Sequence, residues 1–119
     1  MDLNEALAKH ANWKLRFRSA ISNRETMDVG TISKDHYCEF GKWLNGEAKS
    51  KFNNFPSFSE CVTKHAAFHV EAGKVAKAVN DKKYEEATAM IDNLDSPYTK
   101  ASSAFGVAII HLRKEAGLI

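Results

Sequence analysis

The chain has 119 residues, a formal net charge of +2, and 44% hydrophobic and 27% charged residues. This length supports one hydrophobic core and excludes a multidomain enzyme. The small net charge does not indicate a nucleic-acid partner, and two cysteines are too few for the disulfide framework of a small secreted domain. We therefore expect a single domain, residues 1–119, whose cysteines are reduced thiols or metal ligands.

The sequence shows no targeting signal and no membrane span. Charged residues interrupt the N-terminal segment 1–9, which is therefore unlike the apolar part of a signal peptide. The longest apolar run, 107–110, is far shorter than the roughly 18 residues that a transmembrane helix needs. These features predict a cytoplasmic protein with no direct membrane insertion.

In chain order, the first predicted helix begins near Asp2 and ends at about Asn23. Hydrophobic residues recur along it at steps of three and four, with polar residues on the opposite face. Asp2 and Glu5 predict a capping box at its start. His10 lies in the middle of the apolar face. The polar residues that follow, 24–36, predict a long loop.

A short helix is predicted over residues 37–44, where the dipeptide 45–46, Asn-Gly, ends it. Pro56 closes the next connection. Ser57 and Glu60 then predict a second capping box, which opens a long helix with a broad apolar stripe. This helix should end near residues 80–81, Asn-Asp.

Two more helices complete the predicted fold, over residues 82–93 and from Ser96-Pro97 to about Ala116. The last helix is apolar on more than one side, because Val107, Ile109 and Ile110 lie off its main stripe. A helix of this kind is covered on two faces, which favours an all-α helical bundle that dimerises. The alternative is that these are isolated surface hydrophobic residues, which are common.

Three histidines interrupt the predicted core stripes. His65 and His69 are four residues apart on one helix face, so both imidazoles can reach one point. A lone core histidine is more often a hydrogen-bonded packing residue, but three in one core would each need a buried partner. With Cys38 from the short helix, His10, His65 and His69 provide the ligand types of a tetrahedral zinc site.

Three further residues fit such a site. Gly41 lies inside the short helix, where it would allow close approach to a neighbouring segment. Trp13 and Trp43 are placed to form an apolar shell that excludes water. Four protein ligands leave no open position for an activated water, so the pattern argues against an enzyme.

Together these residues resemble the chemoreceptor zinc-binding (CZB) domain family of bacteria over essentially all of the chain. The resemblance rests on three motifs: His10-x-x-Trp13, Cys38-x-Phe40-Gly41-x-Trp43 and His65-x-x-x-His69. It implies that His10, Cys38, His65 and His69 bind one zinc ion per chain. It further implies an antiparallel four-helix bundle with an additional short helix, assembled as a symmetric homodimer.

The same resemblance implies a cytoplasmic sensory domain of bacterial signal transduction. CZB domains occur in soluble chemoreceptors, attached to diguanylate cyclases, and alone. The expected output is therefore a methyl-accepting chemotaxis or diguanylate cyclase domain, in the same or another chain. The expected signals are zinc availability and oxidation of the zinc-bound cysteine by species such as hypochlorous acid.

Oxidation is expected at Cys38 and not at Cys61, because Cys61 lies on the packed stripe of the long helix. Three alternatives remain open: a zinc site that is only structural, a metal-free interaction module, and a hemerythrin-like non-haem iron bundle. The iron bundle would need more histidines and bridging carboxylates on the core stripes. His36 lies in the predicted loop and His111 off the last stripe.

Overall fold

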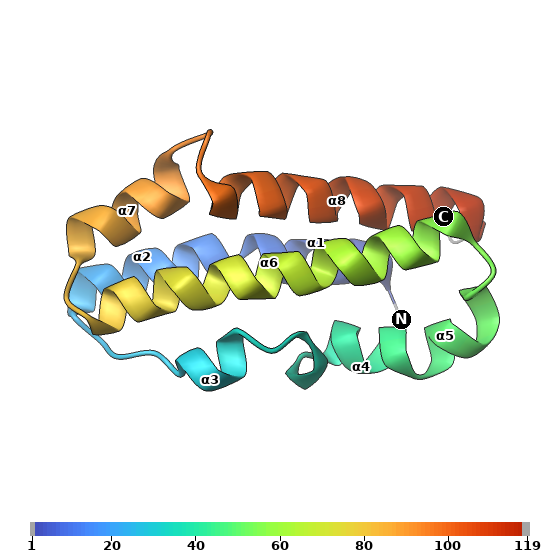
Figure 1. Ribbon diagram of the computed structural model, residues 1–119, viewed down its shortest axis with the longest axis horizontal. Helices are drawn as coiled ribbons and strands as arrows, with labels where there is room; N and C mark the ends of the chain where they lie inside the picture. Colours follow the sequence, from blue (N-terminus) through green and yellow to red (C-terminus); the bar gives the residue numbers. More distant parts are fainter. Residues whose placement is uncertain (1, 118–119) are drawn as a thin grey trace.

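The computed structural model describes residues 2–117, apart from the side chain of Tyr37. Within these residues the regular structure is entirely helical, as the sequence predicted (Figure 1). In chain order the elements are α1 (Leu3–Ala11), α2 (Trp13–Asn23), α3 (Val29–Ile32), the 3₁₀ helix η1 (Asp35–Tyr37), α4 (Glu39–Asn45), α5 (Glu47–Phe52), α6 (Pro56–Asn80), α7 (Tyr84–Asp92) and α8 (Pro97–Glu115). Met1 and residues 118–119, the ends of the expected domain, lie outside the described residues. No helix of the described part could span a membrane.

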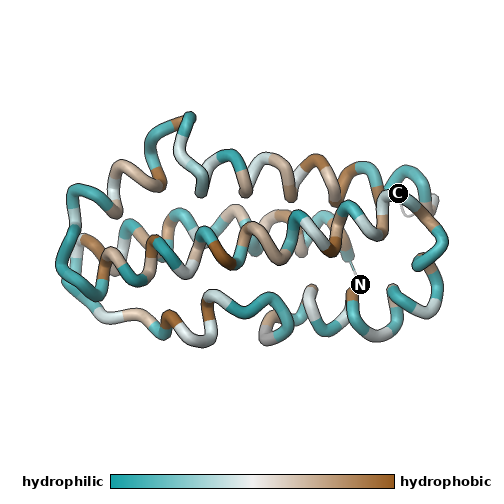
Figure 2. Tube along the Cα trace, in the orientation of Figure 1, coloured by the Kyte–Doolittle hydropathy of each residue, from teal (hydrophilic) through white to brown (hydrophobic). Residues whose placement is uncertain are grey.

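Helix α6 lies at the centre of the fold and packs against α2, α3, α7 and α8 (Figure 1). Hydrophobic residues recur along α6 and α8 between hydrophilic ones (Figure 2), as expected for helices with one buried face. Phe17 of α2, Phe68 of α6 and Phe105 of α8 are completely or almost completely buried. These three rings join the main helices into one core.

The first predicted helix is interrupted, so its expected continuity is wrong. Asn12 separates α1 from α2, consistent with the low helix propensity of asparagine. The cap at the start is confirmed, because the Asp2 carboxylate accepts hydrogen bonds from the backbone N–H groups of Asn4 and Glu5 at 2.9 and 3.2 Å. The Glu5 side chain instead pairs with Lys9 at 3.3 Å.

The region predicted as a loop, residues 24–36, contains helical turns, so that prediction is also wrong. Asp28 caps α3 by accepting from the Thr31 backbone N–H at 3.2 Å, and η1 follows. Asn80, at the end of α6, accepts from the Met27 N–H at 2.7 Å and donates to the Met27 carbonyl at 2.8 Å. The short helical turns thus depend on contacts with α6 that the local sequence does not reveal.

Helix α6 begins at Pro56, and the predicted capping box of Ser57 and Glu60 is wrong. The Ser57 N–H and hydroxyl both donate to the Glu115 carboxylate of α8, at 3.2 and 2.7 Å. Glu60 instead contacts His111 Nδ1 at 3.1 Å. The start of α6 is capped by a residue far away in the sequence, which periodicity cannot indicate.

The C-terminal half agrees with the sequence prediction. Helix α6 ends at Asn80, and Ser96 caps α8 by accepting from the Thr99 N–H at 3.1 Å. The apolar residues off the main stripe of α8 have different environments: Ile109 is buried in this chain's own core, whereas Val107 is 48% exposed. Only part of the second apolar face therefore lacks a partner within the described chain.

Candidate metal centre

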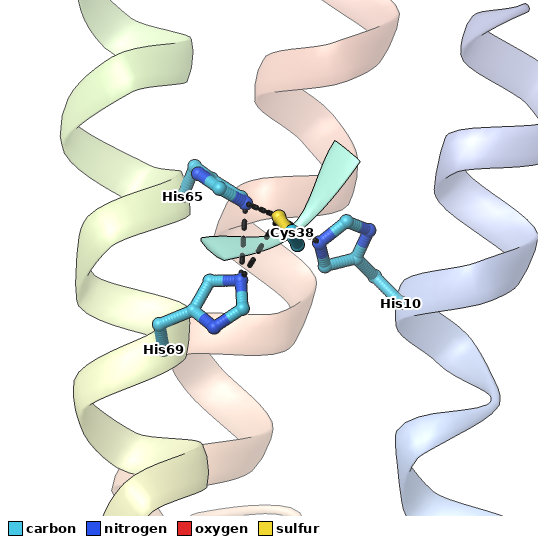
Figure 3. A group of neighbouring side chains, drawn as sticks. All are labelled: His10, Cys38, His65 and His69. Carbon is cyan, nitrogen blue, oxygen red and sulfur yellow. Dashed lines mark hydrogen bonds between the residues drawn. The ribbon is translucent and has the colours of Figure 1, made fainter. Parts of the chain in front are cut away.

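The four residues predicted as metal ligands come together from three parts of the chain (Figure 3). His10 lies in the last turn of α1, Cys38 is the N-cap residue of α4, and His65 and His69 lie one turn apart on α6. All three histidines are buried and Cys38 is half-buried. The i,i+4 spacing on α6 thus places two of the side chains. The end of α1 and the start of α4 bring the other two to the same point.

Four distances between ligand atoms are close to those of a tetrahedral zinc site. Cys38 Sγ lies 3.3, 3.6 and 3.9 Å from the Nε2 atoms of His65, His69 and His10, and the Nε2 atoms of His65 and His69 are 3.1 Å apart. Zinc bond lengths place tetrahedral sulfur and nitrogen ligands about 3.6 Å apart and two nitrogens about 3.3 Å apart. All four atoms lie within 4.8 Å of one another. The cluster therefore fits one metal ion.

Backbone carbonyls fix the orientation of two imidazoles. His10 Nδ1 donates to the Ala6 carbonyl at 2.8 Å, and His69 Nδ1 donates to the Ile32 carbonyl at 2.9 Å. Because a carbonyl only accepts, Nδ1 carries the proton in both rings and Nε2 keeps its lone pair. Both Nε2 atoms can thus bind a metal. Metal-binding histidines in other proteins likewise donate a hydrogen bond from the ring nitrogen that does not bind the metal.

The imidazole of His65 differs from the other two in its hydrogen bonding. His65 Nδ1 is the buried side-chain nitrogen or oxygen atom that has no hydrogen-bond partner in the described part of the chain. The Asp35 carboxylate lies 3.9 Å away, just beyond hydrogen-bonding distance. A buried polar atom without a partner is rare and calls for an explanation.

The Cys38 thiol is held at the start of a helix. Its Sγ accepts from the Gly41 N–H at 3.3 Å and donates to the Asp35 carbonyl at 3.4 Å. Burial raises the pKa of this thiol, whereas the N–H groups of the helix start lower it. Without a metal, Cys38 is therefore a protonated thiol at neutral pH. A bound cation would stabilise the thiolate.

Burial keeps the three histidines neutral. It lowers the pKa of His10 from 6.5 to about 4 and that of His65 to about 2, and it also lowers the pKa of His69. Protons therefore do not compete with a metal for these imidazoles near neutral pH. Neutral imidazole is the form that binds zinc.

Two glycines allow the connection between α3 and α4 to approach the cluster. A Cβ atom on Gly41 would lie 1.9 Å from the Asp35 carbonyl oxygen, which confirms the close approach expected there. A Cβ atom on Gly73 of α6 would lie 2.6 Å from Ser33 Cβ. The role of Gly73 was not predicted, although a glycine within a long helix is the signal that could have indicated it.

Aromatic rings surround His10. Its ring centroid lies 5.8, 5.5 and 4.8 Å from those of Phe40, Phe68 and Phe105. Phe40 was expected at the site, and Trp43 packs on it at 5.7 Å. Phe68 and Phe105 were not singled out, because the sequence showed them only as core residues. An apolar shell of this kind strengthens electrostatic interactions at the cluster.

The sulfur side of the cluster is open to two clefts, of about 540 and 580 Å³. Cys38, Trp13 and Arg16 line both clefts, and the Arg16 guanidinium lies 3.8 Å over the Trp13 ring. The predicted exclusion of water by Trp13 is thus incomplete, because this ring borders two openings. Small molecules in solution have a route toward Cys38.

Comparison with known families agrees with this geometry. The family model of the chemoreceptor zinc-binding domain matches residues 10–76. The chain belongs to this family. CZB domains are zinc-binding signalling domains with regulatory and not catalytic roles, and the cluster is able to hold one zinc ion. Comparison of the chain with curated proteins and with solved structures found no match.

The composition of the cluster bears on the iron alternative. In the described part of the chain, the one group of residues placed to hold a metal contains three histidines, one cysteine and no carboxylate. A hemerythrin-like pair of irons needs bridging carboxylates and more histidines. His36 and His111 lie outside the group. The donor set favours zinc over a di-iron centre.

Proposed function

We propose that His10, Cys38, His65 and His69 bind one zinc ion per chain. The supporting observation is the convergence of three neutral imidazoles and one thiol at distances close to those of a tetrahedral site. Bound zinc supplies a positive charge that stabilises the thiolate, so Cys38 releases its proton when the metal binds. Four protein ligands leave no position for a reactive water, which suits sensing and not hydrolysis.

The whole chain, residues 1–119, is in this proposal a single cytoplasmic sensory domain. Its architecture is an antiparallel four-helix bundle with an additional short helix, and two copies form a symmetric homodimer. Membership of the CZB family supports these assignments, and the exposed Val107 of α8 is consistent with a partner surface. The output is a methyl-accepting chemotaxis or diguanylate cyclase domain in the same or another chain.

The signal is zinc availability or oxidation of Cys38. With hypochlorous acid as oxidant, the zinc-bound thiolate is converted to a sulfenic acid and chloride leaves, a two-electron oxidation of sulfur. Cys38 is suited to this step because it is half-buried and borders both clefts. Cys61 is not, because it is buried in the core and burial raises its pKa to about 12.

Native mass spectrometry of the purified protein tests the ligand assignment. We expect one zinc ion per chain in the wild type and in the control variant Cys61→Ala, and loss of zinc in Cys38→Ala. The spectra also report the assembly state, which we expect to be a dimer. Equal zinc content in Cys38→Ala and the wild type would contradict the role of Cys38.

Titration with hypochlorous acid tests the sensing role. We expect zinc release in step with sulfenic acid formation at Cys38, mapped by trapping with a sulfenic-acid reagent and peptide mass analysis. Cys61→Ala should behave like the wild type. Oxidation confined to Cys61, or complete oxidation of Cys38 with zinc still bound, would exclude the proposed switch.

A further inference from the structure

The end of α3 and the connection from α3 to α4 contact three of the four proposed ligands. The Ile32 carbonyl accepts from His69 Nδ1 at 2.9 Å, and the Asp35 carbonyl accepts from the Cys38 thiol at 3.4 Å. The Asp35 carboxylate lies 3.9 Å from His65 Nδ1. This one short segment therefore places an oxygen atom next to each of two histidines and next to the cysteine.

Among the described residues, His65 is the one of the three histidines whose Nδ1 has no hydrogen-bond partner. Its side chain is completely buried, so water cannot serve as the partner at the surface. When His65 Nε2 binds a metal, the proton of the neutral ring lies on Nδ1, and leaving that buried N–H unpaired would cost about 1–3 kcal/mol. The position thus requires an acceptor, and Asp35 Oδ2 is the carboxylate oxygen placed beside it.

The Asp35 side chain is free to complete this contact. It is 32% exposed, so the core does not lock it in place. A shift of about 1 Å would bring its oxygen into the normal range for a hydrogen bond. Gly41 keeps the Asp35 backbone against α4, because its missing side chain leaves room for the Asp35 carbonyl.

We propose that Asp35 is a positioning residue whose carboxylate accepts a hydrogen bond from His65 Nδ1 when His65 Nε2 binds zinc. This inference rests on the proposed function. A carboxylate partner orients the imidazole and makes it a more basic ligand than a carbonyl partner does. Asp35 also touches Cys38 through its carbonyl, so a displacement of Cys38 would disturb His65 as well.

Zinc affinity measured by competition with a chelator tests this inference. Asp35→Ala should weaken zinc binding by roughly tenfold to a hundredfold, the usual effect of losing such a partner. Asp35→Asn keeps a neutral acceptor and should lie between Asp35→Ala and the wild type. The matched control is Glu39→Ala, which removes the same charge next to Cys38 from a side chain that is 81% exposed. We expect this control to bind zinc like the wild type.

NMR of the ring nitrogens provides the readout that separates positioning from a general charge effect. In the zinc form, the His65 Nδ1 proton should be visible and slow to exchange in the wild type and in Glu39→Ala. In Asp35→Ala that signal should disappear or shift, while the Nδ1 protons of His10 and His69 stay unchanged. The wild-type spectrum is informative even without variants.

Three results would overturn the assignment of Asp35. The first is unchanged zinc affinity in Asp35→Ala. The second is weakened affinity with an unaffected His65 Nδ1 proton, which would place the effect of the carboxylate elsewhere. The third is a wild-type zinc form in which the His65 Nδ1 proton exchanges as freely as in water. A wild type that fails to bind zinc would instead overturn the proposed function, and this inference with it.

Discussion

Helix α6 and the region of residues 24–55 provide the proposed site in different ways. Helix α6 is a continuous helix of 25 residues in the centre of the core, and its geometry alone places His65 and His69 side by side. Residues 24–55 contain four short elements, α3, η1, α4 and α5, with many exposed residues. The position of Cys38 in this region therefore depends on specific contacts with other segments and not on the geometry of one long helix.

The region of residues 24–55 is held by a small set of buried apolar side chains and by a few specific contacts, and the buried side chains are Ile32, Phe40, Leu44 and Ala48. Ser33 packs on Gly73, Asp35 packs on Gly41, and Asn80 pairs with the Met27 backbone. A smaller share of this region is buried than of α6, and a less buried region opens locally more readily than a core helix. Zinc would therefore stabilise the position of this region far more than that of α6. Loss of zinc would let this region open locally.

Removal of zinc should have the largest effect and should show this difference directly. A metal that binds only the folded state stabilises it by about 4 kcal/mol when free zinc exceeds Kd roughly a thousandfold. On chelation we expect amide hydrogen exchange to accelerate in residues 24–55 much more than in α6. Equal acceleration in both regions would contradict the comparison.

Gly41→Ala should be the most disruptive single substitution in the region of residues 24–55. The new Cβ would lie 1.9 Å from the Asp35 carbonyl oxygen, a backbone atom that cannot move without displacing the whole connection. We expect a loss of about 3 kcal/mol in unfolding free energy, at the upper end of overpacking costs, together with weaker zinc binding. Urea unfolding and chelator competition measure both.

Gly30→Ala is the matched control for Gly41→Ala. A Cβ on Gly30 would come no closer than 3.6 Å to its nearest neighbour, Asp28 Oδ1, which is an ordinary contact. This variant should retain the stability and zinc affinity of the wild type. If both variants behaved alike, close packing at Gly41 would not be what positions Cys38.

Acidification should destabilise the metal-free protein through its buried histidines. Burial lowers the pKa of His10 from 6.5 to about 4 and also lowers those of His65 and His69. The unfolded state therefore binds more protons in this range, so stability is fully present above about pH 6.5 and is lost as the pH falls toward 4. We expect a loss of about 3 kcal/mol or more, because one pKa unit corresponds to about 1.4 kcal/mol.

Urea unfolding of the metal-free protein over this pH range measures the loss. The loss of stability in acid would then involve the core around His65 and His69 as well as the region of residues 24–55. A stability that stays constant from pH 6.5 to 4 would show that the histidines are not neutral and buried in the metal-free state.

Asn80→Ala should have the smallest effect of the four changes. It removes both hydrogen bonds to the Met27 backbone, at a cost of about 1 kcal/mol. Asn23→Ala, which removes one exposed hydrogen bond to Ser19, is the control. We expect faster hydrogen exchange near Met27 only in Asn80→Ala. Unchanged exchange there would mean that this contact does not hold the region of residues 24–55.

The three histidines among the proposed ligands could be predicted from the sequence because each is visible in a local pattern. The prediction of Cys38 depended on its place in the predicted short helix and on the resemblance to the CZB family. His65 and His69 share one helix face, and His10 interrupts an apolar stripe, so periodicity alone pointed to them. Ser96-Pro97 likewise indicated the start of α8 through local cap chemistry. Interactions of this kind depend on residues only a few positions apart.

Other features depend on contacts between distant segments. The carboxylate of Glu115 that caps Ser57 comes from the other end of the chain, and the role of Gly73 depends on Ser33 packing against it. The position of Asp35 beside His65 likewise arises only when α6 and η1 meet. Neither propensity nor periodicity carries such information.

Zinc K-edge X-ray absorption of the zinc-loaded protein gives the most direct test of the four-ligand site. We expect one sulfur neighbour at about 2.3 Å and three nitrogen neighbours at about 2.0–2.1 Å, in a four-coordinate site. Any zinc that Cys38→Ala retains should have no sulfur neighbour. A wild-type spectrum without a sulfur neighbour, or with two, would contradict a site made by His10, Cys38, His65 and His69.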